Sequence, residues 1–402
     1  MRTPALPGSW DGLIVICAAT PWLGHRLLDQ ALALELSRVA PVLYVDPPRS
    51  VINHVRPGGR APSRPALRLI QPGLAHLTPT APPFHQRPGV KPFSIMATRR
   101  ALTRAVAALG SPPVEAVIVT SLNPLFGACG ERTRVFYAGD DYIAGASLMR
   151  IAPKRLRRLD RRQPATADLV VTVSEVLADH YRVMGHDPLV VPNGCDFDHY
   201  ADAAQAPLPA GELPLSPVAG LIGTLSERID VNLLDAVVDA DISLLLVGRR
   251  PPGADFESLD RLLVRPQVSW AGPRSFDELP SYLRVMDVGL VPYSSNHPFN
   301  RASSPLKVLE YLAAGRAVVS TDLPSVRELN TDLVTIAEGP QAFAAAVAEA
   351  ARTAHDPDLI ARRQAFAARH SWAARLQPLV RALDLSYVDH TLTDPLSPGV
   401  AR

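Results

Sequence analysis

At 402 residues, the chain is longer than a single ordinary hydrophobic core and suits two domains of roughly 150–200 residues each. Its 41 Lys and Arg residues nearly balance 39 Asp and Glu residues, and a formal charge of +2 gives no indication of a nucleic-acid partner. No run of 18 or more apolar residues occurs, which excludes a transmembrane helix on length. The N-terminus lacks the pattern of a signal peptide, and the three widely spaced cysteines predict neither a disulfide framework nor a zinc site, so a cytoplasmic location is expected.

Short β-branched runs alternate with helical patterns along the chain, which predicts an α/β fold whose parallel sheets carry helices on both faces. In the first half, strands are expected at 13–17, 42–45, 117–120, 135–137, 169–173 and 189–191. Residues 47–92, dense in Pro, Gly and Arg, are expected to form loops over one edge of the first domain.

The second half repeats this plan, with strands expected at 218–222, 243–247, 268–270, 288–291, 317–320 and 334–336. The aperiodic segment 192–213 separates the halves and is interpreted as the inter-domain connection. Open parallel sheets bind ligands outside the carboxyl ends of their strands. Two such domains facing each other therefore predict a cleft in which the chemistry takes place.

The most informative stretch is residues 300–329, NRASSPLKVLEYLAAGRAVVSTDLPSVREL. Ser304 is a good N-cap and Pro305 fits the first helical position. Lys307 would then lie in the first turn, where the helix dipole disfavours a cation unless an anion is bound. Glu310 lies one turn further along the same face. From these residues alone, the pair is interpreted equally as a diphosphate site or as an exposed ion pair on a surface helix.

This stretch resembles the donor site of GT-B glycosyltransferases, in particular the retaining group with a Glu-x7-Glu signature and its bacterial teichuronic-acid-type branch, which reads SPLK-x-x-EYLA-x-G. The resemblance implies that Ser304, Pro305 and Leu306 offer backbone contacts to the nucleotide diphosphate, although Pro305 has no N–H to donate. Lys307 would neutralise the leaving diphosphate, and Glu310 would bind the ribose hydroxyls. Ala302 stands where the first glutamate of the signature is expected.

Two further segments of the second half carry the resemblance. GLIGTLSERID resembles the turn at which basic residues meet the diphosphate, with Gly223 at the turn, Arg228 as the remaining cation and Thr224 where many relatives have arginine. WAGPRSFDELP resembles the segment whose opening loop passes the nucleobase, with Pro273 and Arg274 as candidates. The alternatives are an ordinary turn after a strand and a surface loop.

In the first half, the turn Pro-Trp-Leu-Gly ending at Gly24 resembles the glycine loop that approaches donor and acceptor across the cleft. YAGDDY follows a predicted strand end on the cleft side, where relatives place a catalytic or acceptor-contacting residue. Asp140 and Asp141 are therefore candidates for an acceptor-orienting base, and the alternative is that one of them caps the following helix. Asp196 and Asp198 form an Asp-x-Asp pattern, but their place in the hinge argues against a metal site.

The resemblance implies two Rossmann-like doubly wound domains facing across a cleft, with an acceptor-side domain at 1–198, a donor domain at 199–372, and a crossover helix with its tail at 373–402. It also implies transfer of a sugar from a nucleoside-diphosphate sugar to an acceptor hydroxyl, with retention through front-face attack assisted by the leaving phosphate. A UDP-sugar is the favoured donor substrate, and neither a cofactor nor a metal is required.

Two alternatives to this function stay open. A GT-B sugar-nucleotide epimerase would use the same fold with additional acid and base residues in the cleft. A degenerate, non-catalytic scaffold would agree with Ala302 and Thr224. No GxGxxG follows the first predicted strand and no GxxxxGK[ST] occurs, which argues against a dinucleotide oxidoreductase and a P-loop NTPase.

The acceptor class is left open by the sequence between a glycan, a lipid-linked molecule and a small molecule. The run 150–162 contains seven basic residues and is bounded by Pro153 and Pro164. It is interpreted either as a contact for anionic lipid headgroups at the inner face of the membrane or for a phosphorylated acceptor, or as a solvated helix face.

Overall fold

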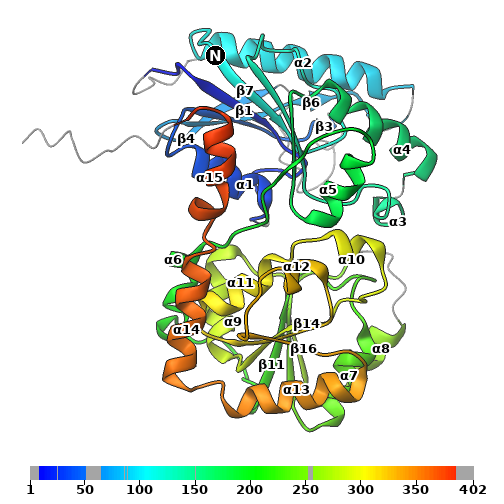
Figure 1. Ribbon diagram of the computed structural model, residues 1–402, viewed down its shortest axis with the longest axis vertical. Coiled ribbons are helices and arrows are strands. Elements are labelled where there is room, and N and C mark those ends of the chain that lie inside the picture. The colour runs from blue at the N-terminus through cyan, green and yellow to red at the C-terminus, as the bar shows by residue number, and fades with distance from the viewer. Residues whose placement is uncertain are drawn as a thin grey trace, which may run out of the picture.

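The computed structural model describes residues 9–24, 26–50, 65–85, 87, 89–149, 151–251 and 257–385. Figure 1 shows two α/β bodies, one formed by the N-terminal half of the chain and the other by the C-terminal half. Among the described residues, the first body contains a sheet of eight strands and the second a sheet of six. The prediction of two sheets that are largely parallel is therefore confirmed.

The N-terminal sheet has the strand order β10-β9-β8-β7-β1-β2-β5-β4, and its neighbouring strands are parallel except for β4 and β5. Its strands are β1 Leu13–Cys17, β2 Val42–Val45, β4 Ala66–Gln71, β5 Leu74–Thr78, β7 Val114–Val119, β8 Thr133–Ala138, β9 Leu169–Thr172 and β10 Leu189–Val190, and a separate small sheet pairs β3 Arg49–Ser50 with β6 Thr80–Ala81. The sequence of β1, LIVIC, is buried at every position, as a central strand covered on both faces requires.

Helices cover both faces of this sheet. They are α1 Leu28–Leu36, α2 Lys91–Ala108, α3 Ala146–Met149, α4 Pro153–Arg162 and α5 Glu175–Arg182, with a short 3-10 helix at Pro164–Thr166. Alternate residues of β1 face opposite helices because side chains of a strand alternate. Ile14 and Ile16 belong to the cluster that contains α1, whereas Leu13 and Val15 belong to the cluster that contains α2.

The C-terminal sheet is parallel, with the order β13-β12-β11-β14-β15-β16. Its strands are β11 Val218–Ile222, β12 Ser243–Val247, β13 Val268–Gly272, β14 Val288–Val291, β15 Ala317–Ser320 and β16 Val334–Ile336. The surrounding helices are α7 Val231–Asp239, α8 Glu257–Leu263, α9 Leu279–Val285, α10 Pro298–Ala302, α11 Leu306–Ala313, α12 Pro324–Arg327, α13 Pro340–Arg352 and α14 Pro357–Ala368, with a 3-10 helix at Phe276–Glu278.

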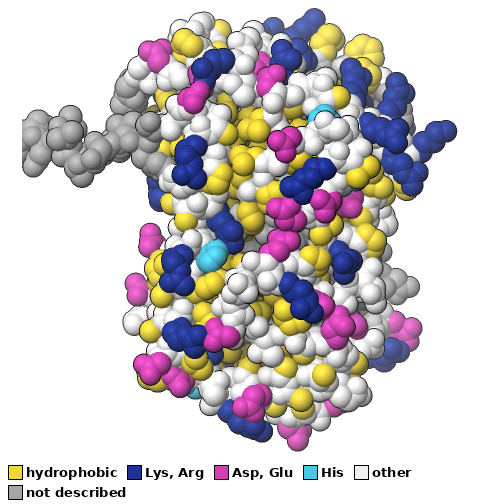
Figure 2. Space-filling view, viewed as in Figure 1, with side chains coloured by type: hydrophobic (Ala, Val, Ile, Leu, Met, Phe, Trp, Pro, Cys, Tyr) yellow, Lys and Arg dark blue, Asp and Glu magenta, His cyan; other side chains and the backbone are white. Residues whose placement is uncertain are grey.

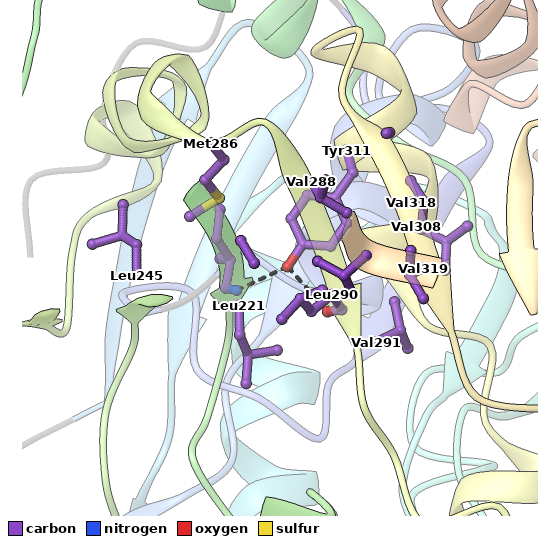
Figure 3. Packing of buried hydrophobic residues seen from close by; sticks show 14 of the residues in the cluster. Leu221, Leu245, Met286, Val288, Leu290, Val291, Val308, Tyr311, Val318 and Val319 are labelled. Atoms are coloured by element: carbon purple, nitrogen blue, oxygen red, sulfur yellow. Dashed lines mark hydrogen bonds between the residues drawn. The ribbon is translucent and has the colours of Figure 1, made fainter. Parts of the chain in front are cut away.

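Tyr311 fixes α11 against this sheet, as Figure 3 shows. Its ring is fully buried, and its hydroxyl accepts a hydrogen bond from the Ile222 N–H at 2.9 Å and lies 3.4 Å from the Leu290 carbonyl. A Cβ at Gly289 would lie only 2.3 Å from the Tyr311 ring, so this strand position has no space for a side chain. This close approach packs α11, the helix that carries Lys307, directly against β14.

The chain crosses between the two bodies twice, at adjacent places. The first crossing leads to α6 Phe197–Ala201 and a 3-10 helix at Ala203–Gln205, and the second leads from α14 to α15 Trp372–Ala382. An isolated parallel bridge joins Cys195 to Ser371 at this point. Trp372 and Leu376 of α15 then pack into the core of the N-terminal body, beside α1.

One expectation about an irregular segment is wrong. The stretch 47–92 contains β4 and β5 among its described residues, while 51–64 lie outside them. LAHLT does not look like a buried strand because His76 and Thr78 are polar, but both are buried and the His76 Nε2 lies 2.9 Å from the Asp46 carboxylate. The segment 192–213 runs between the two bodies and contains the short helix α6.

Candidate active site in the cleft between the two sheets

A cavity of about 400 Å³ lies between the two bodies and is bounded by residues from both. It opens at the carboxyl ends of the strands, since Asp140 follows β8, Gly223 follows β11 and Gly248 follows β12. The site residues predicted from the sequence that line it are Asp140, Gly223, Thr224, Arg228, Arg274, Ser304, Pro305, Leu306, Lys307 and Glu310.

Lys307 is a buried cation in the wall of this cavity, with 8% of the residue exposed. Its Nζ lies 4.6 Å from the centre of the Tyr293 ring, and a Cβ at Gly223 would lie 3.2 Å from this Nζ. Gly223 has a φ of +131°, which glycine adopts without strain. Burial alone would raise the pKa of Tyr293, but Lys307 and Arg228 outweigh it and lower this pKa. The ammonium group of Lys307, from the start of α11, therefore lies next to the turn that follows β11.

The start of α11 differs from the expected one in a single respect. The helix begins at Leu306 with Pro305 as its N-cap, so the prediction that Ser304 caps it is wrong. The Ser304 hydroxyl instead accepts a hydrogen bond from the Asn193 N–H at 3.3 Å, and its carbonyl accepts one from the Asn193 side chain at 2.8 Å. Because Ser304 is used for this link to the hinge, the first amides of α11 have no side-chain cap and remain available to an anion.

Arg228 supplies a second cation from the loop after β11. Its guanidinium carbon lies 4.5 Å from the ring centre of Tyr293 and 4.7 Å from that of Phe299. Thr224 also lines the cavity but contributes no charge. Arg249, which the sequence did not single out, is an exposed third cation in the lining. Arg249 could have been identified as a site residue from the sequence, because it follows the end of β12 and Gly248 directly.

Glu310 faces the cavity one turn after Lys307. Its Oε1 accepts a hydrogen bond from the hydroxyl of the buried Tyr200 at 3.3 Å. Burial raises the pKa of Glu310 to about 7, although Lys307 and the Tyr200 hydrogen bond act in the opposite direction. A carboxylate with one oxygen held by a tyrosine is well placed to accept hydrogen bonds from vicinal hydroxyls.

The two adjacent carboxylates after β8 have different roles. Asp141 caps the following turn, since its Oδ1 accepts hydrogen bonds from the Ile143 and Ala144 N–H groups at 2.9 and 2.8 Å. Asp140 lines the cavity and is accessible from it, although protein atoms surround it closely. This desolvation raises the pKa of Asp140 to about 6, against the effect of Arg228. Of the two, only Asp140 is therefore placed to act on a substrate.

Besides Asp141, two residues assigned to the cleft from the sequence do not line it. Gly24 is exposed, its φ is not positive, and a Cβ there would make only an ordinary 3.8 Å contact, so neither space nor backbone conformation requires glycine. Pro273 is also exposed outside the cavity, whereas its neighbour Arg274 lines it and forms an ion pair with Glu278 at 3.6 Å. In each segment a nearby residue lines the cavity instead: Arg26 near Gly24, and Arg274 next to Pro273.

The loop after β1 reaches the C-terminal body through Arg26. Its guanidinium group lies 3.1 Å from the Asp196 carboxylate and 4.5 Å from the ring centre of Phe276, whose ring also stacks on His199. Arg26 and Phe276 both line the cavity, and the sequence indicated neither. Asp196 is thus engaged in an ion pair. Within the described ranges, no group of three or more His, Cys, Asp or Glu residues is arranged to hold a metal ion.

Comparison with known proteins agrees with this geometry. Residues 218–353 match the family model for glycosyl transferases group 1. The chain is also similar to a Bacillus subtilis protein described as a putative teichuronic acid biosynthesis glycosyltransferase, TuaH, with 30% identity over 226 residues. That match spans 52% of this chain and 56% of the relative, so it covers about half the length of each.

Solved structures resemble the whole described architecture. Sucrose-phosphate synthase from Thermosynechococcus elongatus aligns over 93% of this chain and 99% of its own, with a TM-score of 0.68 and 19% identity. Anabaena HepE in complex with UDP and glucose aligns over the same shares, with a TM-score of 0.61 and 15% identity. These likenesses establish the GT-B fold, in agreement with the expectation from the sequence.

Proposed function

We propose that this chain transfers a sugar from a nucleoside-diphosphate sugar to an acceptor hydroxyl. The observation that carries this proposal is the meeting of Lys307, the Gly223 turn and the uncapped start of α11 at the cavity wall, with Glu310 one turn away. A cation beside free amides suits a diphosphate, and a carboxylate at that spacing suits the hydroxyls of the attached ribose. The group 1 match over residues 218–353 covers all of these positions.

In the proposed reaction, the bond between the sugar and the diphosphate breaks and the acceptor oxygen replaces the leaving phosphate. Negative charge grows on that phosphate in the transition state, where Lys307 and Arg228 stabilise it from fixed positions. Asp140, on the opposite wall, orients the acceptor hydroxyl. We propose retention by front-face attack, in which an oxygen of the leaving phosphate takes the proton of the acceptor hydroxyl and no protein nucleophile is needed. Because two cations and a helix start serve the diphosphate, the proposal includes no metal and no resident cofactor.

The favoured donor is a UDP-sugar. Support comes from solved neighbours of the same fold, since HepE is described in complex with UDP and glucose and also with UDP-glucose. Incubating the purified chain with UDP-, GDP-, ADP- and dTDP-sugars and measuring the released nucleoside diphosphate tests the proposal. Release from at least one donor, lost in Lys307→Ala, is expected. Nucleotide binding without any release would favour the scaffold alternative, and conversion of the donor to an epimer would favour the epimerase alternative.

We further propose peripheral contact with an anionic membrane through α2 and α4. Residues 47–114 contain ten Lys and Arg residues and no Asp or Glu. On α4, the exposed cations are Lys154, Arg157, Arg158, Arg161 and Arg162, and Figure 2 shows Lys and Arg side chains gathered at this corner of the N-terminal body. Phe93 of α2 is 60% exposed, and Phe84, in the segment that precedes α2, is 62% exposed. These two rings add apolar side chains to the proposed membrane contact. Arg150 lies outside the described residues.

Flotation with liposomes, with and without phosphatidylglycerol, tests this membrane contact. Each engaged cation contributes about 1 kcal/mol near an anionic surface, so recovery should require the anionic lipid and fall with added salt. Arg157→Gln combined with Arg158→Gln should reduce it. Equal recovery from both kinds of liposome would show that the α4 cations form only a solvated face. Within the residues described, no helix is long and apolar enough to span a membrane.

A further inference from the structure

Asn300 of α10 is a buried polar residue in direct contact with the cleft cation Arg228. It is fully buried, and its Oδ1 accepts a hydrogen bond from the Arg228 Nε–H at 2.8 Å. Its side-chain amide donates to the Arg228 carbonyl and to the Ser294 carbonyl, both at 3.0 Å. Burying an amide is costly unless its hydrogen bonds are made, and here they bind both the backbone and the side chain of one arginine.

These contacts set the direction of the guanidinium group. With Nε bound to Asn300 and with the Tyr293 and Phe299 rings 4.5 and 4.7 Å from the guanidinium carbon, the group is held at one edge and packed against two rings. An arginine fixed through Nε presents its two terminal nitrogens, which match the oxygens of a phosphate. Among the described residues, no carboxylate lies within 4.0 Å of the Arg228 nitrogens, so the two terminal nitrogens are available to a ligand.

The same helix touches the N-terminal body at two places. A Cβ at Gly145 would lie 2.8 Å from the Phe299 ring, so the ring sits where only glycine leaves space. The Ser174 hydroxyl at the start of α5 donates a hydrogen bond to the Ala302 carbonyl at 2.7 Å. The Gly145 N–H donates to the Asp141 carbonyl, which places the Phe299 contact on the turn that begins beside Asp140. Helix α10 thus links the Arg228 site to the opposite wall.

We infer that Asn300 is a positioning residue for Arg228. Phe299 contributes to the same position, because its ring packs against both the Arg228 guanidinium group and the turn at Gly145. The inference rests on the proposed function. Arg228 is held toward the leaving diphosphate by Asn300, and the ring that packs against it is fixed by the N-terminal body. Neither Asn300 nor Phe299 lines the cavity, so both act through Arg228 rather than on the substrate.

The pKa of Asp140 depends on the position of Arg228 and can therefore report on it independently. The groups that face Asp140 electrostatically are Arg228, Asp29, Asp141, Tyr142 and Tyr293. Burial raises the pKa of Asp140, and Arg228 is the neighbour that lowers it. Loosening Arg228 should therefore raise this pKa above its value of about 6 and move the acidic limb of the pH–rate profile upward.

A double-mutant cycle between Asn300→Ala and Arg228→Met tests the inference. Asn300→Ala alone should lower kcat about tenfold or more and leave the donor KM less affected, as the loss of a charge-assisted contact predicts. In the Arg228→Met background it should add little, because its effect passes through the missing guanidinium group. Phe299→Leu is the milder variant and should act in the same direction. Asn232→Ala, exposed on α7, is the control and should leave turnover unchanged. Additive effects would overturn the positioning role.

Nitrogen NMR of the arginine side chains separates this inference from the proposed function. The Arg228 Nε–H should exchange slowly with solvent in the wild type and fast in Asn300→Ala, whether or not any sugar nucleotide is turned over. A slowly exchanging signal with no turnover from any donor would leave the positioning intact and contradict the proposed function. An Arg228 Nε–H that exchanges equally fast in both proteins would overturn the inference.

Discussion

The C-terminal wall of the cleft takes two of its charged groups, Lys307 and Glu310, from a single turn of α11, whereas the N-terminal wall takes its polar residues from separate loops after β1, β7 and β8. The first arrangement is local in sequence, because side chains three positions apart share a helix face. The second depends on the order of strands in the sheet. The charged groups of the C-terminal wall can therefore be recognised from one motif, whereas those of the N-terminal wall come together only in the folded chain.

The largest expected effect concerns the N-terminal wall. Asp140→Asn should lower kcat by roughly 10²–10⁴-fold if this carboxylate orients and polarises the acceptor hydroxyl, with donor binding nearly unchanged. Turnover in the wild type should fall as the pH drops through about 6, since burial raises the pKa of Asp140 to that value and protonation removes the acceptor of the hydrogen bond.

Asp141→Asn is the matched control for this experiment. Asp141 caps two amides instead of facing the cavity, so its replacement should cost about 1 kcal/mol of stability or less and leave kcat within a fewfold of wild type. Equal kinetic losses in the two variants would show that the division of roles between these neighbours is incorrect.

On the C-terminal wall, Lys307→Ala should act mainly on kcat. It removes a charge-assisted contact of about 1.5–3 kcal/mol, or roughly 10- to 150-fold, which strengthens as the leaving diphosphate gains charge. Steady-state kinetics with varied donor measures the effect. Lys154→Ala, an exposed lysine on α4, should have no effect with a soluble acceptor. A Lys307→Ala enzyme with unchanged kcat would reduce this lysine to a structural cation.

Glu310→Gln should act on binding, because ribose hydroxyls do not change during the reaction. We expect the donor KM to rise about tenfold with a smaller change in kcat, as the loss of uniform binding predicts. Two residues of one helix turn would then differ in their effects, with Lys307 acting mainly on kcat and Glu310 mainly on the donor KM. A variant with an unchanged KM and a strongly reduced kcat would assign Glu310 to the chemistry instead.

The same variant should change the pH dependence of stability in the ligand-free protein. Folding raises the pKa of Glu310 from 4.5 to about 7, so this group favours the folded state below pH 4.5 and loses that contribution as the pH rises through 7. Glu310→Gln should therefore gain about 1–3 kcal/mol over wild type near pH 8 and little near pH 4. Denaturant unfolding at both pH values measures it. The exposed Glu212→Gln should show no such difference.

The smallest expected effect is that of chelation. With the diphosphate served by Lys307, Arg228 and the start of α11, turnover should be the same within error in EDTA and in buffer with magnesium or manganese. Activity that disappears in EDTA and returns with either ion would show that the C-terminal wall does not neutralise the diphosphate alone.

Much of the fold could be predicted from the sequence because buried parallel strands appear as short apolar runs, such as LIVIC in β1 and SLLLV in β12. β5 could not be predicted, since its polar His76 is buried beside Asp46, which follows the neighbouring strand β2 and is 30 positions away in sequence. The capping role assigned to Ser304 failed for a similar reason. Its hydroxyl is taken by Asn193, which is 111 positions away in sequence.

The position of two charged groups in the C-terminal wall of the cleft could be predicted for the opposite reason. Lys307 and Glu310 are three positions apart in sequence and share a helix face, whereas Asn300, Tyr293 and Arg228 meet only through folding. The missing first glutamate also gains an explanation. Ala302 is 1% exposed, packs with the core of the N-terminal body and does not line the cavity. A charged side chain at this position would be buried between the two bodies.

Calorimetric titration of UDP, GDP, ADP and dTDP into the wild type and into Lys307→Ala tests the donor site most directly. A nucleoside diphosphate carries the charge that the leaving group acquires, so at least one should bind at a single site per chain. In Lys307→Ala that affinity should fall roughly 10- to 150-fold, by the free energy of one charge-assisted contact. Absence of binding by all four nucleotides, or equal affinity of both proteins for the one that binds, would contradict a diphosphate site at the start of α11.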